Sequence, residues 1–304
     1  MKILLLGKNG QVGQALQRTL APLGELVALD RTQSSDGLCG DLGQPECLAA
    51  TIRQMRPDVI VNAAAYTAVD KAQSEPEQAR LINAHAPEVL AREAEALGAW
   101  LVHYSTDYVF NGSGTEPWQE TDATAPLNVY GQTKLEGELR VQAACSRHLI
   151  FRTSWVYAAH GSNFAKTMLK LAQERERLTV INDQWGAPTG AELIASVTAA
   201  AIQKVFAKED ALAGIYHLVA AGETNWHAYA SHVIAQAKLL RPDMPWAVQE
   251  IAPVPSSAFV TAAQRPHNSR LNTHKLQAAF GISLPDWQQG VDSMLDEVLE
   301  PKCV

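Results

Sequence analysis

The feature that most constrains the fold lies at the start of the chain, where the apolar run Lys2 to Leu6 passes directly into Gly7-x-x-Gly10-x-x-Gly13. The run has the length of a buried strand, and Val12, Leu16 and Leu20 follow at helical spacing. Two glycines permit a tight turn close to a pyrophosphate, and the third permits close packing of helix on strand. The segment therefore predicts a strand, a turn and a helix that bind a dinucleotide, with a ligand-free glycine turn as the alternative.

The strand and helix pattern continues along the chain. Four further apolar strands are predicted, at Glu25 to Leu29, Val59 to Ala65, Trp100 to Tyr104 and His148 to Arg152, with helical segments between them. This alternation predicts an α/β fold with a Rossmann-type doubly wound parallel sheet and a smaller carboxyl-terminal α/β substrate domain. We assign residues 1–154 and roughly 184–214 to the dinucleotide-binding domain, and residues 155–183 and 215–304 to the second domain.

Residues at the ends of the early strands indicate how a nicotinamide cofactor is held. Asp30 ends the second strand, where an acid accepts hydrogen bonds from the adenosine ribose of NAD and disfavours a 2′-phosphate. Arg31 follows and would attract that phosphate, so the choice between NADH and NADPH stays open. Asp41-Leu42 suits an adenine contact or a plain turn. The small residues Ala63-Ala64-Ala65 let a dinucleotide lie close to the backbone, or let a helix pack closely.

Tyr130 and Lys134 stand one helical turn apart on the same face. A free phenol has a pKa near ~10, and a neighbouring ammonium favours the phenolate and lowers that value. Such a tyrosine can protonate a carbonyl oxygen while hydride arrives at the carbon. Thr106, at the end of a predicted central strand, supplies a second hydrogen-bond donor. The alternative is an exposed aromatic residue beside a solvated lysine.

Composition excludes several other classes of protein. A net charge of −7 and a pI near 5.7 argue against nucleic acid as a partner. No apolar stretch reaches the ~20 residues of a membrane span, and the amino-terminal run is too short for a signal peptide, so we expect a cytoplasmic protein. Four scattered cysteines fit reduced thiols better than disulfides or a zinc site. Near the carboxyl end, Arg265 and Arg270 suit an anionic group such as a diphosphate, or a solvated basic turn.

Taken together, these motifs resemble the extended short-chain dehydrogenase/reductase family. The glycine motif, Asn62-Ala63-Ala64-Ala65, Ser105 to Phe110 and Tyr130-x-x-x-Lys134 occur in the order and at the spacings of that family. Within it, the resemblance is greatest to reductases of nucleotide-linked ketosugars and covers essentially the whole chain. Supporting stretches are Tyr66 to Ala72, Pro126 to Gly131, Arg152 to Tyr157, Gln184 to Thr189 and Arg265 to Leu271.

The resemblance implies hydride transfer from NADH or NADPH to C4 of dTDP-4-dehydro-β-L-rhamnose, within polysaccharide biosynthesis. It gives Tyr130 the role of general acid, Lys134 that of lowering the Tyr130 pKa and holding the nicotinamide ribose, and Thr106 that of binding the sugar carbonyl. Substrate contacts are implied for Thr106, Asp107, Trp155 and Arg265. The cofactor residues implied are Gly7, Gly10, Gln11, Val12, Gly13, Asp30, Arg31, Asp41, Leu42, Ala63, Ala64, Ala65, Tyr104, Tyr130 and Lys134.

Neighbouring functions of the same fold are less well matched. Dehydratases of the family use Asp-Glu directly after the threonine, whereas this chain has Asp107-Tyr108, so dehydration is disfavoured. Epimerases are disfavoured only by the overall match. A non-catalytic NAD(P)-binding regulatory subunit would not need the Tyr130, Lys134 and Thr106 set. A reductase of another nucleotide-linked ketosugar stays open.

Quaternary structure is weakly constrained. Some related reductases are dimers joined through Mg²⁺ held by carboxylates, one of them in the first helix. Here the helix Gln11 to Leu20 has no acid, and Ala15 occupies the expected position. Glu192 is then a lone and weak magnesium candidate, and the resemblance implies a monomer or a homodimer without an established metal.

Overall fold

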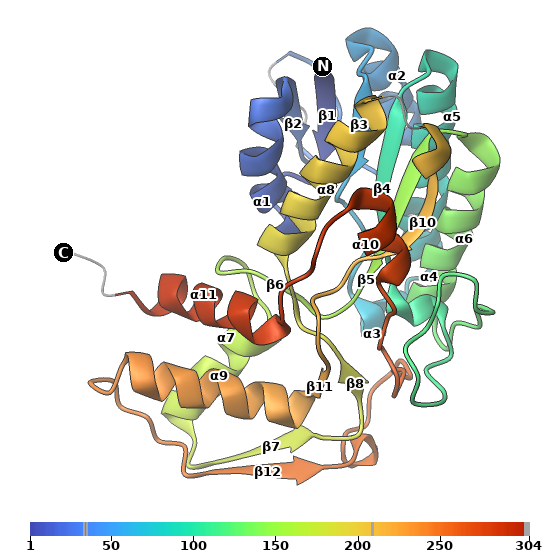
Figure 1. Ribbon diagram of the computed structural model, residues 1–304. Coiled ribbons are helices and arrows are strands. Elements are labelled where there is room, and N and C mark those ends of the chain that lie inside the picture. The colour runs from blue at the N-terminus through green and yellow to red at the C-terminus, as the bar shows by residue number, and fades with distance from the viewer. Residues whose placement is uncertain (33, 35, 208–209, 301–304) are drawn as a thin grey trace.

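The computed structural model describes residues 1–300 except 33, 35 and 208–209. Cys303 and the last residues assigned to the second domain lie outside this range. A six-stranded parallel sheet forms the larger domain, in the order β10-β5-β4-β3-β1-β2. This is the predicted doubly wound topology (Figure 1). The strands are β1 (Lys2–Leu6), β2 (Glu25–Leu29), β3 (Val59–Asn62), β4 (Trp100–Thr106), β5 (His148–Thr153) and β10 (Gly214–His217).

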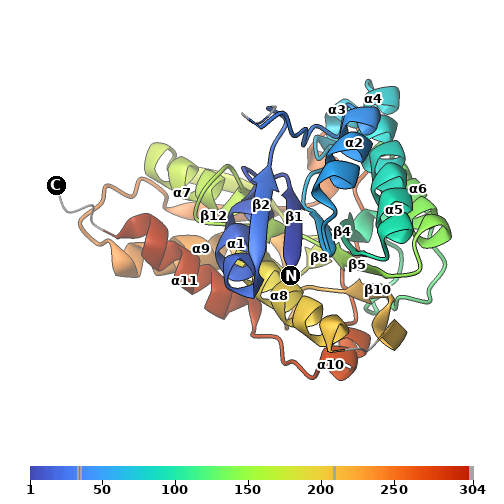
Figure 2. The same ribbon diagram turned by 90° about the horizontal axis from the view of Figure 1, so that it is seen from above.

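Helices cover both faces of the sheet (Figure 2). Successive strand residues point to opposite faces, so Ile3 and Leu5 pack in one apolar cluster while Leu4 and Leu6 pack in another. The first cluster includes α1 (Gln11–Leu20) and α8 (Ala191–Phe206). The second includes α2 (Pro45–Met55), α5 (Ala86–Leu97) and α6 (Val129–Ala144). Burial on both faces explains why the strands read as continuous apolar runs.

The segment between β3 and β4 forms several short helices instead of one continuous helix. The chain forms α3 (Val69–Ala72), α4 (Pro76–Arg80), a π-helical turn over Leu81–His85, and then α5. Asn83 lies in the π-helical turn, where its side chain accepts from Tyr66 N at 2.9 Å and donates to Tyr66 O at 3.1 Å. These hydrogen bonds tie the turn to the loop that follows β3.

The smaller domain has a core of its own. Strands β7 (Arg177–Ile181) and β12 (Glu250–Val254) pair in parallel. Helices α7 (Phe164–Glu174), α9 (Trp226–Leu240) and α11 (Trp287–Leu299) pack around a separate apolar cluster (Figure 1). Short pairs link the domains, namely β6 (Val156–Tyr157) with β9 (Thr189–Gly190) and β8 (Trp185–Gly186) with β11 (Thr224–Asn225). 3₁₀ turns cover Ala21–Leu23, Asp107–Val109, Asp210–Leu212 and Ser256–Ala258.

The predicted domain boundary is wrong at one point. Residues from 215 were assigned to the second domain, but β10 (Gly214–His217) pairs with β5 as the edge strand of the main sheet. Helix α10 (His274–Phe280) also packs on the larger domain through Leu276 and Phe280. The chain returns to the first core because Tyr216 and Leu276 find apolar partners there.

Two expectations from composition can be compared with the structure. None of the helices in the described residues is long and apolar enough to cross a membrane. Cys39, Cys47 and Cys145 are free thiols.

Candidate active site

The glycine loop is too tight for side chains. Gly7 has φ +85°, and a Cβ placed on it would lie 2.7 Å from Ala64 N. A Cβ on Gly13 would lie 2.0 Å from Gly7 O, whereas one on Gly10 would come no closer than 3.4 Å. Gly7 and Gly13 are therefore required by backbone packing, and the loop is held directly against the end of β3.

The start of helix α1 suits an anion. Its N-cap residue, Gly10, offers no side-chain hydrogen bond, and its first turn contains no acid. The first N–H groups of a helix have no partner within it, and the helix dipole favours negative charge there. Gln11 faces Asn163 instead, whose Nδ2 donates to Gln11 Oε1 at 3.0 Å, while Val12 packs against the core. The loop fits the pyrophosphate of a dinucleotide.

Asp30 is already engaged by neighbouring donors. Asn9 Nδ2 donates to Oδ2 at 2.7 Å, Thr32 N donates to Oδ1 at 2.8 Å, and Lys8 Nζ lies 3.6 Å away. The Thr32 hydrogen bond is the largest cause of the lowered pKa of Asp30. Arg31 is exposed beside it. The carboxylate thus stands at the expected place with two cations near it, which suits NADH and NADPH alike.

The other predicted cofactor residues differ in their surroundings. The Asp41 carboxylate accepts from Gly43 N at 2.9 Å, so it closes its own turn, and Leu42 is buried in the core. The backbone of Ala63 and Ala64 lies against Gly7. Ala65 is exposed.

The carboxyl end of β4 brings Thr106 and Tyr130 together. Thr106 is 5% exposed, its Oγ1 donates to Asp107 Oδ1 at 3.1 Å, and it lies close enough to the Tyr130 phenol to lower the pKa of that group. Tyr130 stands in the first turn of α6, whose N-cap Asn128 accepts from Gly131 N at 2.8 Å. The predicted acid and the predicted second donor are therefore neighbours.

The expected effect of Lys134 on Tyr130 is not seen. Burial raises the pKa of Tyr130 to about 12, although the Thr106 hydrogen bond opposes this. Lys134 is 2% exposed, and its Nζ donates to the backbone oxygen of Tyr104 at 2.6 Å. Burial lowers the pKa of Lys134 to about 8, against the opposing charge of Glu138. Tyr130 thus holds its proton at neutral pH, which is the form that a general acid needs.

Tyr104 contributes through its backbone and not its side chain. Its phenol is buried in the core and lies 2.7 Å from Thr198 Oγ1 on α8. Strand alternation turns this side chain to the helix-covered face, and the cofactor contact of Tyr104 stays a prediction. Its carbonyl instead positions Lys134.

Asp107 is a buried carboxyl group next to Thr106. It is 2% exposed, and in the described residues its Oδ2 has no hydrogen-bond partner. Burial raises its pKa to about 7, although hydrogen bonds from Ser269 and Thr106 oppose this. An unpaired oxygen at this depth suits a ligand hydroxyl, in agreement with the predicted sugar contact.

We expect Asp107→Asn to stabilise the protein more at pH 8 than at pH 5. The folded-state pKa of about 7 exceeds the ordinary value near ~3.9. The stability that Asp107 contributes is complete below about pH 4 and is lost as pH rises through about 7. Thermal midpoints of both proteins across this range measure the difference, and a difference that does not change with pH would contradict the assignment.

Trp155 and Arg265 are both occupied by protein partners. Trp155 has φ +49°, and its indole stacks on Trp226 with ring centroids 3.7 Å apart. Only part of the ring is left for the predicted sugar contact. The Arg265 guanidinium binds Asp70 at 2.6 and 3.2 Å, so the structure pairs it with a carboxylate instead of leaving it for a diphosphate.

The weak magnesium candidate is also paired. Glu192 forms an ion pair with Arg18 of α1, and Ala15 of the same helix is buried. Across residues 1–300, apart from the four undescribed positions, no group of three His, Cys, Asp or Glu side chains could hold a metal. The Arg18 guanidinium already supplies the positive charge next to the Glu192 carboxylate.

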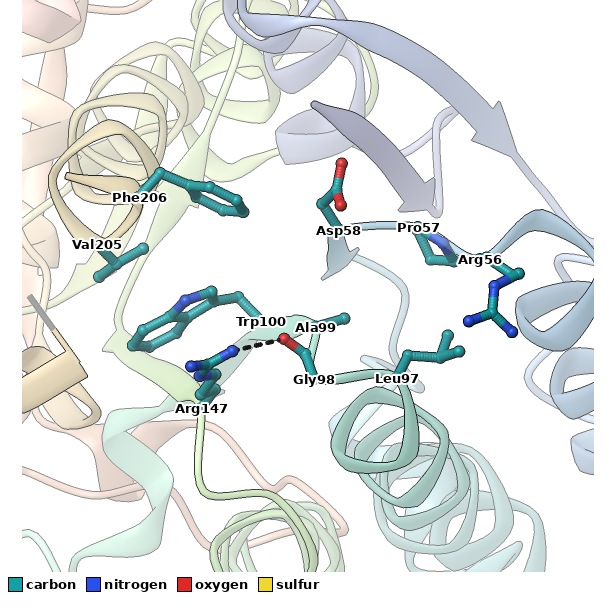
Figure 3. A pocket seen from close by; sticks show the side chains of 10 residues that line it. All are labelled: Arg56, Pro57, Asp58, Leu97, Gly98, Ala99, Trp100, Arg147, Val205 and Phe206. Carbon is teal, nitrogen blue, oxygen red and sulfur yellow. Dashed lines mark hydrogen bonds between the residues drawn. The ribbon is translucent and has the colours of Figure 1, made fainter. Parts of the chain in front are cut away.

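A cavity of about 570 Å³ lies at the opposite edge of the sheet (Figure 3). Asp58, Trp100 and Arg147, at the amino ends of β3, β4 and β5, line it with Phe206 of α8. It contains none of the predicted site residues. Ligands of open α/β sheets bind at the carboxyl ends of strands, which is where Thr106 and the glycine loop lie.

Comparison with known proteins shows the family of the chain. A family model described as RmlD substrate binding domain matches residues 1–300. A dTDP-4-dehydrorhamnose reductase of Escherichia coli strain K12 is 60% identical over 298 residues, which cover 98% of each chain. The chain belongs to the dTDP-4-dehydrorhamnose reductase family. This agrees with the resemblance found in the motifs.

Solved structures of the same family have the same fold. A dTDP-4-dehydrorhamnose reductase of Clostridium acetobutylicum superposes with a TM-score of 0.86 at 33% identity, over 98% of this chain and 99% of that one. The enzyme of Bacillus anthracis, solved in complex with NADP, gives a TM-score of 0.85 at 32% identity, over 98% and 100% of the two chains.

In this member of the family, three site features escaped the sequence reasoning. Ser269 lowers the pKa of Asp107 from a loop far along the chain, so no local spacing signals it. Asn128 caps α6 and also donates to Gln264 O at 2.7 Å, which ties the helix to the second domain. His103, beside Lys134, stands out as a histidine in an apolar strand, and that signal was available.

Proposed function

We propose that the protein reduces the C4 ketone of dTDP-4-dehydro-β-L-rhamnose to give dTDP-L-rhamnose, using NADPH or NADH. It is an oxidoreductase, and its relatives named dTDP-4-dehydrorhamnose reductase match it over nearly their full length. The observation that carries the proposal is the proximity of Thr106, at the carboxyl end of β4, to Tyr130, in the first turn of α6. Both groups can donate to one ketone oxygen.

The cofactor, when bound, supplies hydride. We propose that Gly7, Gly10 and Gly13 admit its pyrophosphate to the N-terminus of α1, and that Asp30 lies at its adenosine end. Lys134 and the loop after β3 would hold the nicotinamide half. A relative solved with NADP supports a nicotinamide dinucleotide as the cofactor.

We propose that side chains of the protein then donate the proton and bind the substrate. Tyr130, protonated at neutral pH, donates its proton to the ketone oxygen as negative charge develops there. Thr106 holds that oxygen in place, and Asp107 binds a sugar hydroxyl through its unpaired Oδ2. We propose that the smaller domain encloses the nucleotide, and that part of the Trp155 ring contacts the sugar.

An absorbance assay tests this function. Purified protein is expected to consume NADPH or NADH, followed by the loss of absorbance of the reduced nicotinamide, only when dTDP-4-dehydro-β-L-rhamnose is added, with dTDP-glucose as the matched control lacking the ketone. No absorbance change with the ketosugar would sink the reductase proposal. A greater rate with another nucleotide-linked ketosugar would keep the chemistry and change the substrate.

A further inference from the structure

Two buried polar side chains outside the proposed catalytic set form a hydrogen-bonded chain next to Lys134. His103 of β4 and Asn62 of β3 are partners in the sheet register, and each is 1% exposed. Asn62 Nδ2 lies 3.1 Å from His103 Nδ1, and the other ring nitrogen, Nε2, lies 3.5 Å from Lys134 Nζ. Buried polar groups are nearly always hydrogen-bonded, so the position of each hydrogen atom between Asn62, His103 and Lys134 can be worked out.

Hydrogen-bond pairing decides which nitrogen of His103 carries the proton. The backbone N–H of Ala64 donates to Asn62 Oδ1 at 3.2 Å, so the amide oxygen is committed and Nδ2 faces the imidazole. An amide NH₂ group can only donate, so His103 Nδ1 must accept. Burial, with a smaller effect of Lys134, lowers the pKa of His103, so the ring is neutral and its one proton sits on Nε2.

His103 therefore presents an N–H to Lys134. An ammonium group offers only donors, whereas a neutral amine has a lone pair that accepts from Nε2–H. Among the residues that the structure describes, the Lys134 ammonium has one short acceptor, Tyr104 O. Of the charged groups around it, Glu138 on α6 favours the ammonium, and that carboxylate is shared with Arg152 of β5. The Tyr130 phenol on α6 is neutral at pH 7.

We propose that His103 and Asn62 are positioning residues for Lys134: Asn62 fixes the tautomer of His103, and the resulting Nε2–H favours the neutral lysine amine. Protons from solvent do not pass through this pair, because both side chains are buried and the Asn62 amide donates a hydrogen bond without taking up or releasing a proton. The role of this pair in catalysis rests on the proposed function. After Tyr130 protonates the ketone, a loosely held proton on Lys134 Nζ passes to the phenolate and leaves a neutral amine and a neutral phenol.

Nuclear magnetic resonance on the cofactor-free protein tests this without any substrate. With lysines labelled at Cε, the Lys134 signal is the one lost in Lys134→Met. Its titration midpoint in the wild type is expected near 8. In Asn62→Ala the ring can move its proton to Nδ1 and accept from the ammonium through Nε2, so we expect the midpoint to rise by about one unit. Asn268→Ala, at an equally buried asparagine outside this chain, should leave it unchanged.

A midpoint that is unchanged or lowered in Asn62→Ala would overturn the proposal. Should that variant fail to fold, the ¹⁵N shifts of His103 in the wild-type protein decide the matter, because they report which ring nitrogen carries the proton. A proton on Nε2 supports the proposal, and a proton on Nδ1 defeats it. Since neither measurement involves the ketosugar, its failure is separate from a failure of the proposed reductase activity.

Discussion

Tyr130→Phe is expected to lower kcat by about 100- to 10,000-fold, because it removes the acid that protonates the ketone oxygen. The Tyr130 hydroxyl lies near Thr106, and burial keeps it protonated at neutral pH. The phenyl ring keeps its edge-on contact with Tyr108, at 5.6 Å between centroids, so the fold should persist. Steady-state kinetics with the ketosugar, together with titration of NADPH binding, measure the effect.

Cofactor affinity should change little in this variant, since the lost group acts in the transition state. Tyr216→Phe is the matched control. It removes the same hydroxyl from a buried tyrosine that donates to Leu212 O at 2.8 Å, on the edge strand β10. Activity above about a tenth of wild type in Tyr130→Phe would remove this residue from its role as the acid.

Glu138→Gln is expected to destabilise the protein by about 3–5 kcal/mol, because it leaves a buried guanidinium without its counter-charge. Glu138 and Arg152 are 0% and 3% exposed at their side chains. Arg152 Nη2 donates to Oε2 at 2.7 Å, and Nε donates to Oε1 at 3.0 Å. Calorimetric unfolding of both proteins measures the loss.

Two further variants separate a buried pair from an exposed one. Glu174→Gln breaks the surface pair with Lys170, at 3.9 Å, and should change stability by less than about 0.5 kcal/mol. Replacing both partners, as Glu138→Gln with Arg152→Met, should recover part of the loss. If Glu138→Gln is no worse than Glu174→Gln, the buried pair does not have the role assigned to it.

Local pattern carried much of the fold and the centre of the site. The strands at Lys2 to Leu6 and Trp100 to Thr106 are apolar runs because helices cover both faces of the sheet, so their sequence signal is strong. Glycine spacing alone indicates the loop, in which a side chain on Gly13 would collide with Gly7 O, although the collision at Gly7 is with the distant Ala64. Tyr130 and Lys134 are one helical turn apart, so their relation is also local.

Other features depend on residues far apart in the chain. The sequence suggested that the Arg265 guanidinium could bind a diphosphate, but its partner Asp70 lies 195 positions away in the sequence. The strand Gly214 to His217 joins the main sheet through β5, which no local pattern reveals. Burial also reverses one expectation, since the Tyr130 pKa rises where sequence spacing suggested that Lys134 would lower it.

The sequence by itself determined the parallel sheet and the glycine loop, and it predicted Tyr130 as the acid, because each depends on a pattern within a single turn, strand or helix. Only the tertiary structure decided what those groups face. It placed Lys134 against Tyr104 O and His103, Asp107 beside Ser269, and Glu138 against Arg152. The physical reason is that hydrogen-bond partners and burial, which set protonation, depend on contacts between distant parts of the chain.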